Sequence, residues 1–354
     1  MDKHSATVWS FFTDTALRLA DDPDRDAARQ WLTTTLRWMI DHGDDAAVQE
    51  VIRSAENAGA ARLLRTIVER ESEVVVGHHY EGDTLLGLFA IPVLVEFPCD
   101  VPESLVDTAL SSIDWATDAL PDLQVVMPPD DSLHLIARFH RFDELLAIPL
   151  SALRKAGHSL ATHAAQETLV RYPFTTVDVP LRNAPTFLRF LVGQRKTTGT
   201  GPASMPELGR LGSSLQQALC NRFDARCRVI VRRGGGFHDA LYTGMWEYQE
   251  RRLEQIATEV AQDSNGYPLT AAVLTCPRQP TNTVTELRFF AGKNVLGRVG
   301  YRLYTRPVEN MDRCVGRIGS VIRQAGIRNV DCVKPNNDDG NKNYSSAPRI
   351  VLPL

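Results

Sequence analysis

The sequence predicts a protein of the mixed α/β (α+β) class, with a helical N-terminal segment followed by two ferredoxin-like (split βαβ) α/β sandwich units. The apolar residues recur at helical spacing up to residue 72, and continuous or alternating apolar runs, typical of strands, begin only after it. Glycine- and proline-rich stretches then separate strand-like from helix-like segments. Because 354 residues exceed a typical single domain, we expect several folded units.

Residues 1–72 are predicted to form an acidic helical module. The helical spacing is shown in the first helix by Trp9, Phe12, Ala16 and Leu19. Gly43 and Gly59 are expected to end the second and third helices, with Asp44 or Asp45 capping the start of the third. Short turns of this kind favour two antiparallel helical pairs.

Residues 73–195 are predicted to form the first α/β unit. Its expected elements are strands at 74–76 and 85–97, a helix from 102, a strand at 123–127, a helix at about 143–163 and a strand at 168–179. The segment 133–142 fits a strand and a helix equally poorly. The long apolar run at 85–97 indicates a strand that is central in its sheet.

Residues 196–333 are predicted to form a second, basic α/β unit. Its expected elements are a surface loop at 196–206, helices at 206–223, 237–262 and 310–325, and strands at 227–232, 269–276, 284–291, 295–304 and 329–333. From residue 227 onward the order βαβββαβ is that of a split βαβ sandwich with one added strand. Residues 334–354 are expected to be a flexible tail, whose apolar end at 350–354 docks as a strand on its own domain or binds another protein's sheet edge.

Charge is distributed unevenly along the chain. Residues 1–131 contain 25 Asp and Glu against 9 Lys and Arg, a net charge of −16, whereas the remaining residues contain 18 against 30, a net charge of +12. This asymmetry predicts a basic C-terminal surface that attracts an anionic partner. Alternatively, the two parts attract each other and leave a nearly neutral particle.

Neither a targeting signal nor a membrane span is expected. Residues 1–20 lack the basic and unbroken apolar regions of a signal peptide, and the longest apolar run is too short to cross a bilayer. The six cysteines occur without a C-x-x-C pair, which favours reduced thiols in a cytoplasmic protein. We expect no cofactor and no bound metal, because neither paired cysteines nor a metal-binding histidine motif is present.

The best candidate for anion or phosphate binding is the turn that precedes the predicted helix at 237–262. Its residues are Arg232, Arg233, Gly234, Gly235, Gly236 and His238. A strand that runs into glycines and then a helix exposes backbone N–H groups at the positive end of the helix dipole, and two arginines stand beside them. The turn lacks the lysine and spacing of a nucleotide-binding loop, so an ordinary flexible turn is the alternative.

A second candidate is a nucleic-acid-binding sheet face. Arg298, Arg302 and Tyr304 fall at alternating positions of the strand predicted at 295–304 and therefore share one face. Basic residues interleaved with aromatics are typical of sheets on which single-stranded bases stack. The alternative is that the aromatic residues belong to the core and the arginines to its rim.

No stretch matches a catalytic signature, so the catalytic residues, if any, are unknown. The leading hypothesis is a non-enzymatic binding or scaffolding protein that uses the basic C-terminal surface, with a protein partner or a second copy of the chain as its ligand. The alternatives are an enzyme that acts on a nucleotide or phosphate substrate around residues 234–238, and a protein that binds single-stranded nucleic acid.

Overall fold

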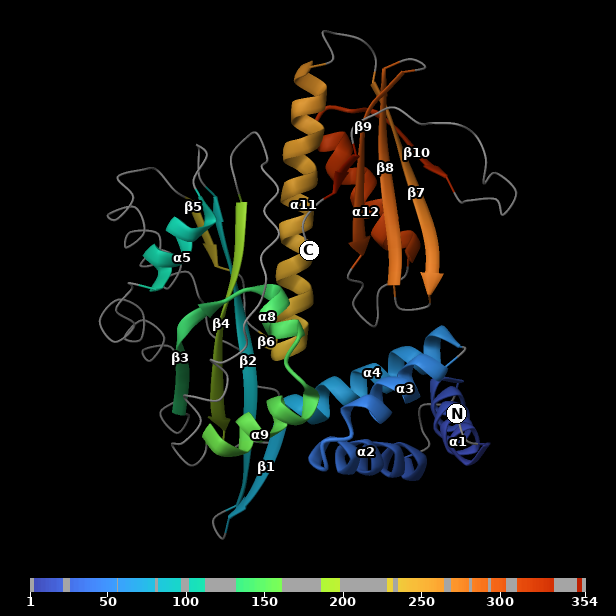
Figure 1. Ribbon diagram of the computed structural model, residues 1–354, viewed down its shortest axis with the longest axis vertical. Coiled ribbons are helices and arrows are strands. Elements are labelled where there is room, and N and C mark those ends of the chain that lie inside the picture. The colour runs from blue at the N-terminus through green and yellow to red at the C-terminus, as the bar shows by residue number, and fades with distance from the viewer. Residues whose placement is uncertain are drawn as a thin grey trace. The chain divides into compact units, whose positions relative to one another are not determined.

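The computed structural model describes residues 3–21, 26–55, 57–79, 82–96, 102–111, 132–160, 186–197, 228–231, 235–263, 269–279, 282–291, 294–303, 311–333 and 349–351. These residues form two compact units, Met1–Gly244 and Met245–Leu354, and the long helix α11 (Phe237–Asp263) contributes residues to both. Figure 1 shows the helices and strands of each unit and labels most of them.

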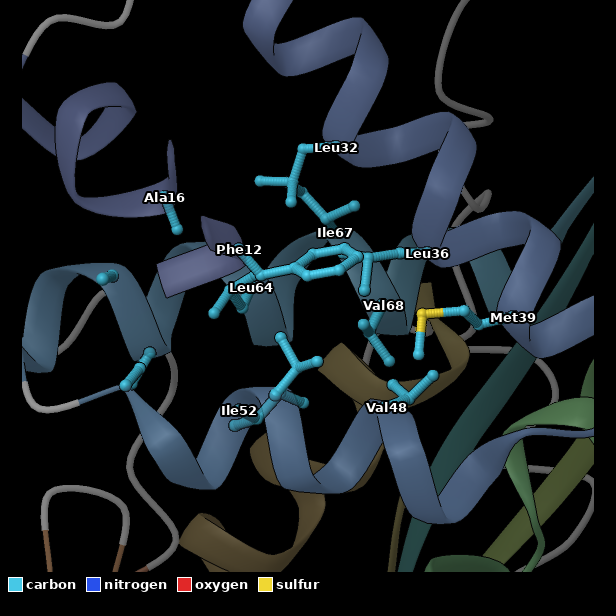
Figure 2. Packing of buried hydrophobic residues seen from close by; sticks show 14 of the residues in the cluster. Phe12, Ala16, Leu32, Leu36, Met39, Val48, Ile52, Leu64, Ile67 and Val68 are labelled. Carbon is cyan, nitrogen blue, oxygen red and sulfur yellow. The ribbon is translucent and has the colours of Figure 1, made fainter. Parts of the chain in front are cut away.

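The first unit begins with helices α1 (Lys3–Asp21), α2 (Asp26–Asp41), α3 (Asp45–Ser54) and α4 (Ala58–Glu73). Their apolar faces meet in one core, in which Leu32, Leu36 and Val48 are fully buried. Figure 2 shows side chains from all these helices converging on this core. The helical pattern predicted for this segment is therefore observed.

The turns between these helices agree only in part with the glycine pattern. Gly43 follows α2 and adopts a φ of +80°, a left-handed conformation that glycine reaches without strain. Gly59, in contrast, lies in the first turn of α4, and the helix is started by Asn57, whose side-chain oxygen accepts hydrogen bonds from the amides of Gly59 and Ala60. A side-chain cap, rather than a terminating glycine, makes this break.

A helix from later in the sequence completes the helical layer. After the short α8 (Phe142–Leu146), α9 (Leu150–Leu160) adds Leu150 to the same core. The Ser151 amide donates a hydrogen bond to Asp45 at 3.0 Å. The buried guanidinium of Arg154 pairs with Asp41 and donates to the Glu71 carbonyl oxygen at 2.6 Å. The N-terminal helices are therefore joined to α9 by polar as well as apolar contacts.

The first sheet is antiparallel throughout its described pairs. Its strands are β1 (Val74–His79), β2 (Gly82–Glu96), β3 (Ser132–His140), β4 (Thr186–Thr197), β5 (Arg228–Val231) and β6 (Gly235–Gly236). The order is β1-β2-β4-β3, and β5 and β6 also pair with β2. Helix α5 (Glu103–Ser111) follows β2 in the chain. The centre of β2 is fully buried, as its continuous apolar sequence predicted.

Three strands of this sheet were not assigned from the sequence, among them the short β6 in the glycine turn. Most of the ambiguous segment 133–142 forms β3, which ends at His140 and has a bulge between Leu135 and Phe139 that disturbs the period-2 pattern. Strand β4 was missed because Arg189 and Gln194 interrupt its apolar run, although both side chains are buried. A central strand with buried polar groups does not show the alternation that reveals a half-buried strand.

The second unit contains a mixed sheet. Its elements are β7 (Leu269–Gln279), β8 (Asn282–Ala291), β9 (Asn294–Leu303), α12 (Met311–Gln324), β10 (Asn329–Val333) and β11 (Arg349–Val351). The strand order is β10-β7-β8-β9-β11, in which β7, β8 and β9 form an antiparallel meander and the two outer strands run parallel to their neighbours.

Both helices of the second unit pack on one face of this sheet. Leu287 and Phe289 of β8 are fully buried in a core with Leu253 of α11 and Ile322 of α12. Ala271 of β7 pairs with Phe289 and joins the same core. Alternate residues of a strand point to opposite faces, so Arg288 lies on the face of the sheet away from the core.

The sequence placed the strand at 227–232 at the start of the second unit, but β5 pairs with β2 in the first sheet. The C-terminal segment docks on its own unit, since Arg349–Val351 pairs with β9. The strands predicted at 123–127 and 168–179, the helix at 206–223 and most of the tail lie outside the described residues. The mixed α/β class is confirmed by the helices and the two sheets. No helix in the described ranges is long and apolar enough to cross a membrane.

Candidate functional site

The glycine-rich turn predicted to bind an anion leads into the first turn of α11. Gly235 and Gly236 form β6, which pairs with Ala90 and Phe89 of β2, and α11 begins at the next residue. Arg232, Arg233 and Gly234 lie outside the described residues, so their part of the predicted site stays a prediction.

A carboxylate of the chain itself lies at the N-terminus of α11. Glu73, the last residue of α4, accepts hydrogen bonds from the amides of Phe237 and His238 at 3.0 and 2.9 Å. It also accepts a bond of 2.7 Å from Nδ1 of the His238 imidazole. The first amides of a helix have no partner within the helix, and its dipole favours negative charge there. Glu73 therefore acts as an internal anion for this helix terminus.

Gly236 makes this approach possible. A Cβ atom added at this position would lie only 2.5 Å from Oε2 of Glu73. Glycine was expected here because a backbone must come close to an oxyanion, and the oxyanion seen in the structure belongs to Glu73. An external phosphate at the same two amides would have to displace this carboxylate.

An acid–hydroxyl pair lies one turn from Glu73 on α4 and one turn from His238 on α11. The hydroxyl of Tyr242 donates a hydrogen bond of 2.7 Å to Glu69. Burial raises the pKa of the Glu69 carboxyl above its usual range, although nearby His238 and Tyr242 favour its charged form. Burial and the neighbouring Glu69 raise the pKa of the Tyr242 hydroxyl. We call Glu69, Glu73, His238 and Tyr242 the α4–α11 polar cluster.

The pKa of His238 is raised by its acidic neighbours. Burial alone lowers the pKa of an imidazole, because the charged form loses its hydration. In this cluster the hydrogen bond and the charge of Glu73, together with the charge of Glu69, outweigh burial and raise the pKa of His238. Arg65 opposes this effect. A protonated His238 is consequently stabilised between two carboxyl groups.

The α4–α11 polar cluster combines acid, base and hydroxyl groups, but its burial points to a structural role. Glu73 and His238 are each only 9% exposed, and Tyr242 is equally buried. The sequence did not indicate Glu73, because it lies 164 positions before the amide of Phe237. Only the three-dimensional meeting of α4 and α11 reveals it.

A second buried charged group lies between α5, β3 and β4. Arg189 of β4 is 3% exposed and donates to Asp107 at 2.8 Å and to Glu103 at 2.6 Å. Arg141 donates to the other oxygen of Asp107 at 2.7 Å. Burial opposes the charge of Arg141, but Asp107 and Glu103 outweigh it and raise the pKa of Arg141. These groups are paired with one another and tie α5 to the sheet.

The second sheet brings three arginines to adjacent positions. Arg288 of β8 pairs in register with Arg298 of β9, and Arg298 pairs in register with Arg349 of β11. Register partners share a face, so all three occupy the face opposite to α11 and α12. We call Arg288, Arg298 and Arg349 the arginine row. Arg349 was not among the residues proposed from the sequence, because only the pairing of β11 with β9 places it there.

The other candidates for nucleic-acid binding are placed only in part. Arg302 lies four residues beyond Arg298 on β9 and therefore on the same face, with Val284 as its register partner. Tyr304 lies outside the described residues. Glu286 occupies the same face of β8 and pairs in register with Gly300, so the face also carries one carboxylate position between Arg298 and Arg302.

No metal-binding group emerges from the part of the chain that the structure describes, where no three His, Cys, Asp or Glu side chains come together suitably. No protein-family model matches the chain, and the searches of curated proteins and of solved structures found no match either.

Proposed function

We propose that this chain is a non-enzymatic binding or scaffolding protein of the cytoplasm, whose second unit docks an acidic partner protein on the sheet face opposite to α11 and α12. The observation that carries the proposal is the arginine row, in which register places Arg288, Arg298 and Arg349 side by side. The described helices of this unit pack on the other face. The acidic partner is a different protein or the acidic N-terminal part of a second copy.

Electrostatics support a bound anion at the arginine row. Guanidinium groups bind carboxylates in a bidentate manner. The second unit, residues 245–354, contains 15 Lys and Arg against 11 Asp and Glu, and this net charge of +4 adds a long-range attraction for acidic partners.

A polyanion-binding assay tests the proposal. We would measure fluorescence anisotropy of a labelled 20-residue poly-glutamate peptide at low salt, with the wild-type chain and with the variant Arg298→Glu/Arg349→Glu. Arg323→Glu is the matched control, because Arg323 is exposed on α12 and α12 packs on the opposite face. We expect the row variant to weaken binding at least tenfold and the control to leave it within twofold. Equal loss in both variants, or no binding by the wild type, contradicts the proposal.

Single-stranded nucleic acid is the second candidate ligand, supported by the placement of Arg302 on the same face as the row. The same assay with a labelled thymidine 20-mer separates the two functions. Tighter binding of the oligonucleotide than of poly-glutamate, with a steep loss at higher salt that Arg298→Glu/Arg302→Glu reduces, would assign the face to nucleic acid.

We also propose that the first sheet is of the split βαβ type. Four of its strands follow the order β5-β2-β4-β3, each antiparallel to its neighbour. Numbered along the chain these strands are 4-1-3-2, the order of a ferredoxin-like sheet, and α5 lies between the first and second of them in sequence. In the second unit, a meander followed by a helix and a parallel edge strand gives a different order.

A further inference from the structure

The N-terminal helices expose aromatic side chains on one surface. Phe11 of α1 is 58% exposed, and Trp31 and Trp38 of α2 are 39% and 55% exposed. Within the described ranges, the other exposed large hydrophobic residues are Leu146 and Leu296, in separate elements. Tryptophan is enriched at the energetically important centres of protein interfaces. We call Phe11, Trp31 and Trp38 the aromatic patch.

The members of the aromatic patch are neighbours by geometry. The rings of Phe11 and Trp31 meet edge to face, with centroids 5.0 Å apart and an interplanar angle of 82°. Trp38 follows Trp31 by seven residues on α2, which is two helical turns, so the two indoles lie on the same side of the helix about 10 Å apart along its axis. The patch therefore has the spacing of an i, i+7 stripe.

The helices that carry the aromatic patch are packed firmly on the helical core. Phe12, next to Phe11, is buried, and the opposite side of α2 places Leu32 and Leu36 in the helical core. Arg37 of α2 donates a hydrogen bond of 2.6 Å to Glu71 of α4. Exposed aromatic rings on such a preorganised pair of helices lose little conformational entropy when a partner covers them.

The charges around the aromatic patch select its partner. Asp14 follows Phe11 by one turn and is exposed, and so is Asp44, which comes shortly after the negative C-terminal end of α2. Asp41, the last residue of α2, is already paired with Arg154. A two-fold contact between copies would bring the acidic rims together, and an anionic lipid surface would meet the same repulsion.

We propose that the aromatic patch binds an amphipathic helix of another protein that carries apolar residues at i and i+7 and basic residues on its flanks. The apolar residues cover Trp31 and Trp38, while lysine or arginine flanks pair with Asp14 and Asp44. This surface belongs to the first unit and is independent of the arginine row.

The test uses two labelled peptides of about 18 residues with the same leucine stripe, one with lysine flanks and one with glutamate flanks. Fluorescence anisotropy with the full chain is expected to show binding of the lysine peptide and at least tenfold weaker binding of the glutamate peptide. Trp38→Ser should weaken binding of the lysine peptide at least tenfold. Leu146→Ser is the matched control, because Leu146 is 45% exposed on α8, and it should leave binding unchanged.

Charge reversal and self-association complete the test. Asp14→Lys should weaken binding of the lysine peptide and strengthen binding of the glutamate peptide, whereas Arg298→Glu/Arg349→Glu should change neither. A thermal unfolding curve of Trp38→Ser that matches the wild type shows that the variant is folded. Equal binding of both peptides, no binding of either, or no effect of Trp38→Ser overturns the proposal. A dimer in sedimentation equilibrium that Trp38→Ser dissociates would assign the patch to a second copy instead.

Discussion

Glu73 accepts hydrogen bonds from both the backbone amide and the imidazole of His238, at 2.9 and 2.7 Å. The same carboxylate accepts the amide of Phe237. One buried acid thus satisfies the start of a helix and the first polar side chain on it.

Replacing Glu73 by glutamine should destabilise the first unit. The amide side chain keeps one acceptor oxygen but loses the charge that faces the helix N-terminus, and charged hydrogen bonds contribute about 1.5–3 kcal/mol each. We expect a loss of about 2 kcal/mol in the free energy of unfolding, measured by urea denaturation. Glu50→Gln is the control, because Glu50 pairs with the exposed Arg53 on one helix and should change stability by less than about 0.5 kcal/mol. Equal effects of the two substitutions would refute a capping role for Glu73.

Stability should depend on pH through His238. Its pKa is raised in the folded state, so the folded chain binds the proton more tightly than the unfolded chain. The resulting stabilisation is fully present below about pH 6.5, the ordinary value for histidine, and is lost as the pH rises through the raised value. The pKa of Glu69 is also raised in the folded state, so this group too contributes stability that is lost as the pH rises. The difference in unfolding free energy between wild type and His238→Gln should therefore shrink as the pH rises from 6 to 9.

The control for this pH dependence is Leu146→Ser, which changes an exposed residue of the same unit and removes no titratable group. Its difference from the wild type should stay constant over the same pH range. A constant difference for His238→Gln as well would show that the imidazole proton is not bound more tightly in the folded state.

Two glycines in helices should respond in opposite ways to alanine. At Gly244 of α11 a Cβ atom would lie 2.7 Å from Cβ of Pro92 and 2.8 Å from Cε1 of Phe190, so Gly244→Ala should force the helix away from the first sheet and destabilise it by about 1–3 kcal/mol. At Gly316 of α12 no heavy atom lies within 4 Å of the added carbon. Gly316→Ala should therefore stabilise the chain by about 0.5–1 kcal/mol through helix propensity. Calorimetric melting of both variants checks the contrast, and a stabilising Gly244→Ala would show that this close packing is absent.

Replacing the acidic partners of the buried Arg189 should destabilise the chain more than replacing Arg189 itself. The Arg189 side chain is 4% exposed, whereas those of Glu103 and Asp107 are 39% and 35% exposed and remain in contact with water. Glu103→Gln/Asp107→Asn leaves a buried guanidinium without a counter-charge and should cost about 3–5 kcal/mol. Arg189→Met keeps the volume and leaves Asp107 paired with Arg141, so its cost should be smaller. Chemical denaturation of both variants measures the order, and the reverse order would contradict it.

The helices and the second sheet were largely predictable because their signals are local. The helix expected at 237–262 is observed at Phe237–Asp263. The strands expected at 269–276 and 284–291 are observed as β7 and β8; the start of β7 and the end of β8 agree with the prediction, whereas β7 ends later and β8 starts earlier than expected. Apolar periodicity and turn residues determine such elements within a window of about 11–18 residues.

Sheet membership and the candidate sites were less predictable because they depend on long-range pairing. The short strand β5 joins the first sheet through its register with Glu96 and its neighbours on β2, more than 130 positions earlier. Glu73 meets α11, and Arg349 meets Arg298, through the same kind of distant contact. Such partners are brought together by tertiary packing, and no local pattern around either residue announces them.

The distance along the chain between Glu73 and α11 also constrains the order in which the first unit is completed during synthesis. The N-terminal helices leave the ribosome long before residues 237 and 238. Glu73 therefore lacks its hydrogen-bond donors, the amides of these two residues, while more than 160 further residues are added. A nascent chain or an expressed fragment that ends at residue 231 would bury this carboxylate without those donors or leave α4 frayed at its last turn. Production of the first unit on its own therefore requires a fragment that continues through the opening turns of α11.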